Sequence, residues 1–158
     1  MTSVLDDDDF KSIIEYFVPL FESKPSFGKF LEHNVESPDF DTPILGFTMQ
    51  DDYVGNLIYR TLHGGVIASM LDDVGGHAIW LKAIEQSKGQ PLEKRIKRVA
   101  KIGSIDLRVD YLQPGKGERF KATASILRMG NKVAVTRMAL HNEEGELIAV
   151  GTGAYTTG

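Results

Sequence analysis

The chain has 158 residues and a formal net charge of −4 at pH 7, and it contains no cysteine. This length predicts one domain, residues 1–158, with a core large enough to need no covalent cross-link. The absence of cysteine excludes disulfides, thiolate catalysis and cysteine-ligated zinc. The negative charge argues against a general nucleic-acid binder, which must neutralise phosphates. A small polyanionic ligand could still bind at a local basic cluster.

The first residues, MTSVLDDDDF, lack the basic start and the apolar stretch of a signal peptide, and no apolar run approaches the length of a membrane span. We therefore expect a soluble cytoplasmic protein with no membrane partner. Apolar residues at helical spacing predict an amphipathic helix over residues 7–23, within an N-terminal helical extension of residues 1–26. The acidic run that precedes this helix lies where carboxylates stabilise a helix N-terminus.

Between Phe27 and Asp51 the pattern predicts strands in ILGFTMQ and in part of KFLEHNVES, with a turn at SPDFDTP. The segment DDYVGNLIYRT shows no clear period and is interpreted as a loop. A long apolar run from Val66 to Ile84 then predicts a helix, with stop signals at Gly89 and Pro91.

The second half of the chain alternates apolar and polar residues, which predicts strands. In SIDLRVDYL one face carries Ile105, Leu107, Val109 and Tyr111, and the other carries Ser104, Asp106, Arg108 and Asp110. Three further segments, RFKATASILR, KVAVTRMALHN and LIAVGTGAY, follow after short turns, so we expect a four-stranded antiparallel meander. The predicted fold class is α+β, with the apolar face of the sheet covering the long helix.

Two adjacent glycines begin the long helix in TLHGGVIASMLDDVGG, residues 61–76. A glycine inside a helix costs about 1 kcal/mol relative to alanine. Gly64 and Gly65 leave the first N–H groups of the helix uncovered, at the positive end of its dipole. Such donors suit a carbonyl oxygen that becomes an oxyanion. Close packing of the helix against the sheet is an equally good explanation.

Asp72 and Asp73 lie about 100° apart around the helix, so at most one faces the apolar side and the other is expected in solvent. Asp72 is eight residues beyond Gly64, which is about 12 Å along a helix. A carboxylate so far away cannot act on a carbonyl held at the first turn of its own helix. If both groups serve one reaction, antiparallel copies of the helix must share them. An enzymatic interpretation therefore predicts an obligate homodimer with two shared sites.

The segments LHGGVIASMLDDVGG, SIDLRVDYLQPGKGE and ASILRMGNKVAVTRMALHNEEGELIAVGTGAY resemble the hotdog-fold acyl-CoA thioesterases of the PaaI-like (4-hydroxybenzoyl-CoA thioesterase) superfamily, over roughly residues 44–156. The resemblance implies a hotdog fold, in which a curved antiparallel sheet wraps a long central helix. It also implies homodimers that share active sites across their interface, with a dimer of dimers as a further assembly. The implied reaction is hydrolysis of an acyl-CoA thioester to a carboxylic acid and free coenzyme A.

The same resemblance implies roles for individual residues. Gly65 would donate its backbone N–H to the thioester carbonyl, next to Gly64 at the substrate, and His63 would orient this region or help polarise the carbonyl. Asp72 would be the nucleophile or the general base, two routes that the residues do not separate. Ser104 falls where some relatives place a hydroxyl that positions the water or the carboxylate.

Two further segments are candidates for substrate binding. Many relatives carry an asparagine six residues before the histidine; Leu57 stands there, and Asn56 lies one place earlier, so either the loop is shifted or the role is vacant. The segment KRIKRVAK, with Arg95, Lys97 and Arg98, could meet the phosphates of coenzyme A. A solvated surface loop is at least as good an interpretation of it.

The four histidines show no metal-ligand spacing, so we expect neither a metal nor a cofactor beyond the coenzyme A of the substrate. Asp73 and His77 match no family role, and His77 is interpreted as a packing or surface residue. Two other functions stay open. One is a hotdog enoyl-thioester hydratase, against which RTLHGG argues because it lacks a proline-rich motif around the histidine. The other is a non-catalytic module that binds or senses acyl-CoA.

Overall fold

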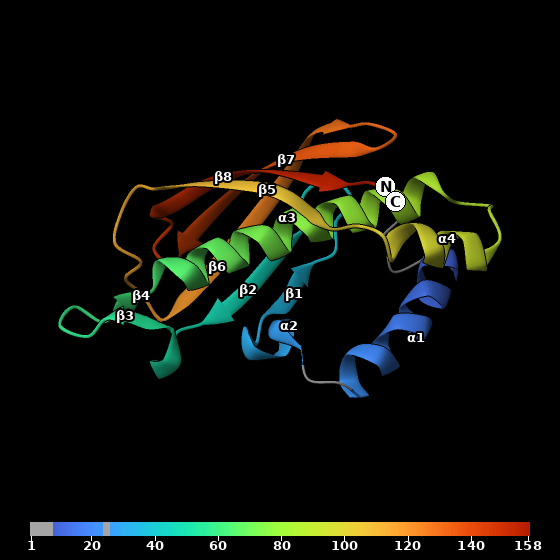
Figure 1. The fold of residues 1–158 in the computed structure, drawn as a ribbon. Helices are drawn as coiled ribbons and strands as arrows, with labels where there is room; N and C mark the ends of the chain where they lie inside the picture. Colours follow the sequence, from blue (N-terminus) through green and yellow to red (C-terminus); the bar gives the residue numbers. More distant parts are fainter. Residues whose placement is uncertain (1–7, 24–25) are drawn as a thin grey trace.

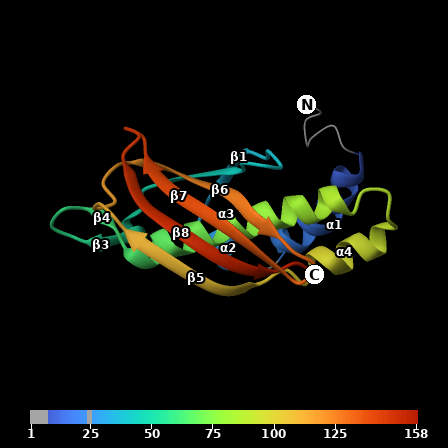
Figure 2. The ribbon, with the colours of Figure 1, turned by 90° about the horizontal axis from the view of Figure 1, so that it is seen from above.

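The computed structural model describes residues 8–23 and 26–158. Its centre is helix α3 (Gly64–Gln86), which lies along one face of a six-stranded antiparallel sheet (Figure 1). Seen from above, strands β5 to β8 cross over this helix (Figure 2). The strand order is β1-β2-β6-β7-β8-β5. The bounds are β1 (Asn34–Ser37), β2 (Ile44–Thr48), β5 (Ser104–Tyr111), β6 (Arg119–Met129), β7 (Val133–Asn142) and β8 (Leu147–Thr156). The predicted α+β class with a long central helix is confirmed.

Helix α3 is apolar around most of its circumference, which is typical of a helix buried in a core. Met70, Leu71, Val74 and Ala78 are all fully buried, and they pack in one cluster with Phe120 and other residues of the sheet. A glycine allows the close approach of α3 to β8, because a Cβ at Gly75 would collide with the hydroxyl of Tyr155. That hydroxyl donates a hydrogen bond of 3.2 Å to the backbone carbonyl of Asp72.

Strand β5 does not occupy the place that a meander would give it. It pairs with β8, for example Leu107 with Gly153, so β7 and β8 lie between β5 and β6. The reason is the length of the connection between β5 and β6. The seven residues from Leu112 to Glu118 are too many for a tight hairpin, but they can bridge three strand spacings of about 4.8 Å each. The expected meander therefore holds for β6, β7 and β8 alone.

The remaining segments differ from the expectations in three places. The predicted loop at DDYVGNLIYRT contains a 3-10 turn, η2 (Asp51–Tyr53), and a small hairpin of β3 (Val54–Asn56) and β4 (Thr61–Leu62). The basic segment forms helix α4 (Leu92–Val99) instead of a loop. A short helix, α2 (Phe27–Phe30), precedes β1 and was not expected.

The expected N-terminal helix is present as α1 (Asp8–Ser23), and residue 7 lies outside the described part of the chain. Its residues Phe10 and Ile13 are buried against Leu81 and Ile84 of α3 and Val99 of α4. These contacts place α1 against the C-terminal half of α3 (Figure 1). In the described residues, no helix is both long enough and apolar enough to cross a membrane.

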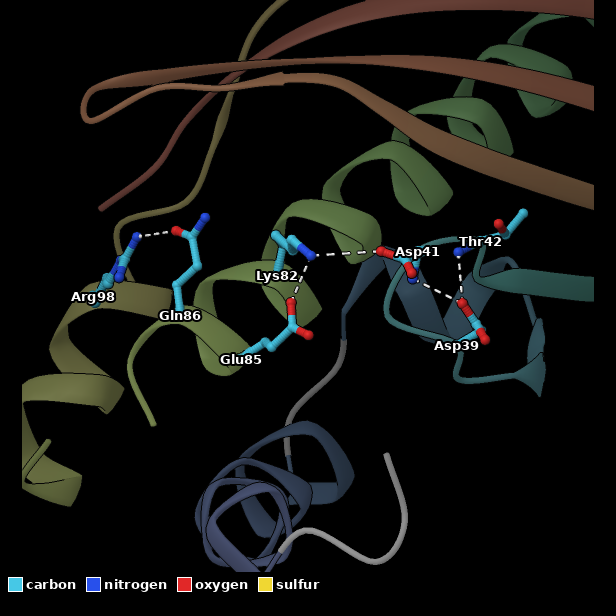
Figure 3. A network of polar contacts seen from close by, with 7 residues as sticks. All are labelled: Asp39, Asp41, Thr42, Lys82, Glu85, Gln86 and Arg98. Carbon is cyan, nitrogen blue, oxygen red and sulfur yellow. Dashed lines mark hydrogen bonds and ion pairs between the residues drawn. The ribbon is translucent and has the colours of Figure 1, made fainter. Parts of the chain in front are cut away.

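Polar contacts also fix the C-terminal half of α3 (Figure 3). Lys82 lies 2.6 Å from Glu85 and 3.5 Å from Asp41, in the turn between β1 and β2. Asp39 holds that turn, since its carboxylate accepts hydrogen bonds from the backbone N–H groups of Asp41 and Thr42 at 2.8 and 3.0 Å. The helix is thus tied to the turn between β1 and β2, at the edge of the sheet.

Candidate active site

A histidine caps the N-terminus of α3. His63 has φ −66° and ψ 136°, and its Nδ1 accepts a hydrogen bond of 2.9 Å from the N–H of Gly65. Its carbonyl accepts from the N–H groups of Val66 and Ile67 at 3.0 and 3.2 Å. Gly64 is the first residue of α3, so its N–H has no acceptor within the helix. The open donor at this helix end is therefore Gly64, while the N–H of Gly65, the expected donor, is occupied by the cap.

Two turns further along α3, the carboxylate of Asp72 is held by a serine. The hydroxyl of Ser104 lies 2.8 Å from Oδ1 and 3.0 Å from Oδ2 of Asp72. Strict alternation placed Ser104 on the same face as Asp106, but a register shift between these two residues breaks the alternation at the start of β5. The bulge turns Ser104 towards the helix. The structure thus brings together two of the predicted site residues, within one chain.

The two halves of the predicted site lie in different cavities. Asp72 and Ser104 line a mostly apolar cavity of about 870 Å³. His63 and Gly65 line another of about 340 Å³, together with Val66 and Ser69. In a single chain the carboxylate and the helix N-terminus therefore do not face one space, in agreement with the separation of about 12 Å along the helix.

The sequence did not predict that His33, Asp73 and His77, three titratable residues, meet in the wall of the larger cavity. Asp73 Oδ2 lies 3.5 Å from His33 Nδ1, and both Asp73 and His77 line the cavity with Asp72. Burial raises the pKa of Asp73, His33 opposes that shift, and the charge of Asp72 adds to it. At most one of the two aspartates was expected on the apolar side of α3, but both line this mostly apolar cavity. The spacing of Asp73 and His77, four residues apart on α3, is a signal that could have linked them.

The ring of His77 stacks on Trp80, with centroids 6.2 Å apart and an interplanar angle of 17°. Its Nε2 atom is buried and has no hydrogen-bond partner in the described residues. Burial, the larger cause, and the nearby His33 together lower the pKa of His77 to about 4. His77 is thus an uncharged part of the cavity wall at neutral pH, which agrees with its interpretation as a packing residue.

Asn56 closes the turn between β3 and β4. Its Oδ1 accepts hydrogen bonds from the N–H groups of Ile58 and Tyr59 at 3.0 and 3.2 Å. Asn56 lines neither of the two cavities. Within one chain, its side chain oxygen is committed to the hairpin and not to the surroundings of Asp72.

The basic segment separates into buried and exposed members. Arg95 is only 1% exposed, and its guanidinium donates to the Ser87 hydroxyl at 3.3 Å and to the Ile84 carbonyl at 3.1 Å, at the C-terminus of α3. A phosphate cannot reach it there, contrary to the expectation for this residue. Arg98 donates to Gln86 at 3.1 Å (Figure 3) and to the carbonyl of Thr157 at 3.4 Å.

Lys97 is exposed and forms an ion pair of 2.6 Å with Glu93, one turn earlier on α4. Because its side chain is exposed, Lys97 stays accessible to an anion from solvent. Among the residues that the structure describes, no group of three or more His, Cys, Asp or Glu side chains could hold a metal ion.

Comparison with known proteins agrees with this architecture. The model of the thioesterase superfamily matches residues 59–149, which include the helix N-terminus, Asp72 and Ser104. The chain belongs to the thioesterase superfamily. It is 44% identical over 132 residues to the medium/long-chain acyl-CoA thioesterase YigI of Escherichia coli, which covers 84% of this chain and 85% of that protein. The YigI protein of Salmonella typhimurium is 46% identical over 114 residues, or 72% of this chain and 74% of that one.

Solved structures of thioesterase-superfamily proteins share the fold. A protein from Shewanella oneidensis related to the superfamily superposes with a TM-score of 0.84 at 36% identity, covering 94% of this chain and 97% of that one. The PaaI protein of Escherichia coli, from the phenylacetic acid degradation operon, gives a TM-score of 0.69 at 17% identity, over 92% and 94% of the two chains. The hotdog arrangement expected for the thioesterase superfamily is confirmed.

Replacement of Arg95 by methionine tests its assignment as a structural anchor. We expect Arg95→Met to lower the free energy of unfolding by about 2–3 kcal/mol, because it leaves buried acceptors at the end of α3 without a donor. Chemical denaturation measures the change. Lys97→Met is the matched control, and it should stay within about 0.5 kcal/mol of the parent protein. Equal stability of the two variants would contradict the assignment.

The burial of His77 predicts a dependence of stability on pH. Between its folded pKa of about 4 and its ordinary value of 6.5, the unfolded chain binds a proton that the folded chain does not. Acidification from pH 8 to pH 5 therefore costs about 2 kcal/mol of unfolding free energy through this residue. The raised pKa of Asp73 acts in the opposite direction, because the folded chain binds that proton first.

In the His77→Gln variant the contribution of His77 to this pH dependence is absent. Its free energy of unfolding should therefore fall less than that of the parent protein over the same pH range, as measured by denaturant titration. Parallel pH profiles of the two proteins would show that folding does not lower the pKa of His77.

Proposed function

We propose that this protein hydrolyses medium- and long-chain acyl-CoA thioesters to fatty acids and free coenzyme A. The observation that carries the proposal is the Asp72 carboxylate, which Ser104 holds in the wall of a mostly apolar cavity of about 870 Å³. Such a volume is in the usual range for a small-molecule site. The similarity to the YigI thioesterase of Escherichia coli, over most of both chains, supports the same activity.

Two routes are open to the Asp72 carboxylate. It can attack the thioester carbonyl carbon and form an anhydride that water then hydrolyses, or it can take a proton from a water molecule that attacks the same carbon. In both routes a negative charge develops on the carbonyl oxygen. The carbon–sulfur bond then breaks, and the coenzyme A thiolate takes up a proton. The hydrogen bond from Ser104 fixes the carboxylate for either reaction.

The N-terminus of α3 supplies the donor for that developing charge. Because the N–H of Gly65 is bound to His63, we assign the donation to the open N–H of Gly64 instead of the Gly65 group expected from the sequence. It lies at the positive end of a 23-residue helix, where negative charge is favoured.

A complete site then requires a second copy of the chain. Strand β5, which carries Ser104, is at the edge of the sheet, and its outer edge is free to pair in the described structure. Two copies joined there antiparallel would continue one sheet through both chains and set their α3 helices side by side in opposite directions. The open N–H of Gly64 in one copy would then face Asp72 of the other. Assembly into a dimer of dimers stays a prediction, as does a location in the cytoplasm.

Among the basic residues, we propose that Lys97 contacts the phosphates of coenzyme A, since it is exposed and α4 ends beside the cavity at Val99. Arg95 and Arg98 instead fasten α4 to its neighbours. Asn56 would reach a substrate only across the dimer, because its side chain oxygen is used in its own hairpin.

Asp72→Asn tests the carboxylate. An amide can neither attack the thioester nor accept a proton from water, so we expect kcat to fall at least about 1,000-fold, measured as free thiol released from a series of acyl-CoA esters. Asp73→Asn, in the same cavity wall, is the matched control and should keep most of the activity. Unchanged turnover in Asp72→Asn would exclude the assignment.

Two further measurements on the parent protein separate the alternative functions. Water addition to crotonyl-CoA without thiol release would indicate a hydratase. Tight binding of acyl-CoA to the parent protein with no turnover would indicate a binding module.

Gly64→Pro tests the oxyanion donor, because the proline ring replaces the N–H by a bond from nitrogen to Cδ. The first position of a helix accepts proline, and the backbone angles of His63 are those preferred before proline. We expect kcat to fall about 100- to 1,000-fold. Gly64→Ala keeps the N–H and adds a Cβ 3.4 Å from the Tyr111 ring, so it is the control. Equal kcat for the two variants would place the donor elsewhere.

A further inference from the structure

The cavity beside Asp72 extends along one face of α3. Asp72, Gly76 and Trp80 line it at intervals of four residues, so they lie on successive turns of the helix. From Asp72 to Trp80 the helix rises about 12 Å. An extended alkyl chain advances about 1.25 Å per carbon, given carbon–carbon bonds of about 1.5 Å. This part of the cavity therefore has the length of about nine or ten carbons.

Gly76 is unusual in that packing does not require it. A glycine within a helix costs about 1 kcal/mol relative to alanine. A Cβ at Gly76 would meet one atom of Tyr155 at 3.7 Å, an ordinary contact, whereas at the neighbouring Gly75 it would collide with the Tyr155 hydroxyl. Gly75 is thus explained by the contact between helix and sheet. The effect of glycine at position 76 is instead to leave the cavity open over the middle of the helix.

Beyond Gly76 the cavity is closed by apolar side chains of helices α1, α3 and α4 and of the segment that follows α4. Phe17 of α1 meets Trp80 edge to face, with ring centroids 5.9 Å apart, and Ile14 lines the cavity beside them. Val99 and Ile102 complete the wall. Such surroundings favour a hydrocarbon chain over a polar ligand.

We propose that the acyl chain of the substrate runs from Asp72 over Gly76 to the Phe17–Trp80 contact, so that Gly76 and helix α1 set the chain length that the enzyme prefers. This inference rests on the function proposed above and adds the place of the acyl chain. It gives α1, an extension outside the residues matched by the superfamily model, a direct part in substrate selection.

Gly76→Val tests the proposal, with kcat/KM measured from butyryl-CoA to palmitoyl-CoA. The valine side chain would block the passage, and each methylene that loses its buried position costs about fourfold. We expect activity on butyryl-CoA to change less than about threefold, while activity on lauroyl- and palmitoyl-CoA falls at least tenfold. Gly76→Ala should show a smaller effect of the same kind and a higher melting temperature.

Phe17→Ala gives a second test that does not depend on the helix substitution. It removes part of the closing wall, so the preferred ester should become longer by several carbons. Glu15→Ala, at an exposed position of α1, is the control and should leave the profile unchanged. If Gly76→Val does not fold, an unshifted profile in Phe17→Ala still overturns the proposal.

Binding of non-hydrolysable S-alkyl coenzyme A thioethers, measured by calorimetry, separates this inference from the proposed function. A parent protein that binds longer thioethers more tightly, with this trend lost in Gly76→Val, but that releases no thiol would keep the inference and remove the proposed hydrolysis. A folded Gly76→Val with the chain-length profile of the parent protein in both assays would overturn the inference and leave the hydrolysis intact. A parent protein that binds no thioether would overturn the inference as well.

Discussion

Helix α3 fixes the distance between the two groups on which the proposed chemistry depends. Its backbone hydrogen bonds hold the rise near 1.5 Å per residue, so the eight residues from Gly64 to Asp72 always span about 12 Å. Side-chain flexibility cannot remove such a separation, since both a backbone N–H and a short aspartate are tied closely to the helix. The two separate cavities are the visible result. The dimer proposed here follows from this rigidity.

At the start of α3, His63 caps the helix and leaves the next N–H group without a partner in the helix. His63 caps α3 by accepting the N–H of Gly65, which satisfies one of the donors that every helix exposes at its first turn. The neighbouring N–H of Gly64 then remains as a free group at the positive end of the dipole. A cap and an open donor therefore occupy adjacent positions of the same turn, and only the geometry of the cap shows which N–H is free.

In the middle of α3, two adjacent glycines have different effects. Gly75 lets the helix approach β8, where the hydroxyl of Tyr155 reaches the carbonyl of Asp72 and holds that turn. Gly76, the next residue, lines the cavity. Along this wall Asp73 lies beside His33, and burial together with the nearby His33 lowers the pKa of His77 to about 4. A mostly apolar cavity of this kind can accept an apolar chain beside the Asp72 carboxylate.

The sequence alone determined the elements and the main chemical candidates. Periods of 3.6 and 2 residues gave α1, α3 and the long strands, because each period reflects which face of its own element is buried. The adjacent glycines and the acid eight residues later gave Gly64, Gly65 and Asp72 as candidates, whereas Ser104 was expected beside them only from the resemblance to the hotdog thioesterases. These are local patterns, and local patterns report local geometry well.

Tertiary structure decided the rest. The place of β5 beside β8, the bulge that turns Ser104 inward, the burial of Arg95 and the use of the Gly65 N–H by His63 each depend on a partner that spacing does not specify. The physical reason is that a side chain or a strand edge takes whichever partner the folded chain brings within hydrogen-bonding or packing distance. Residues far apart in sequence, such as Phe17 and Trp80, acquire a common role only then.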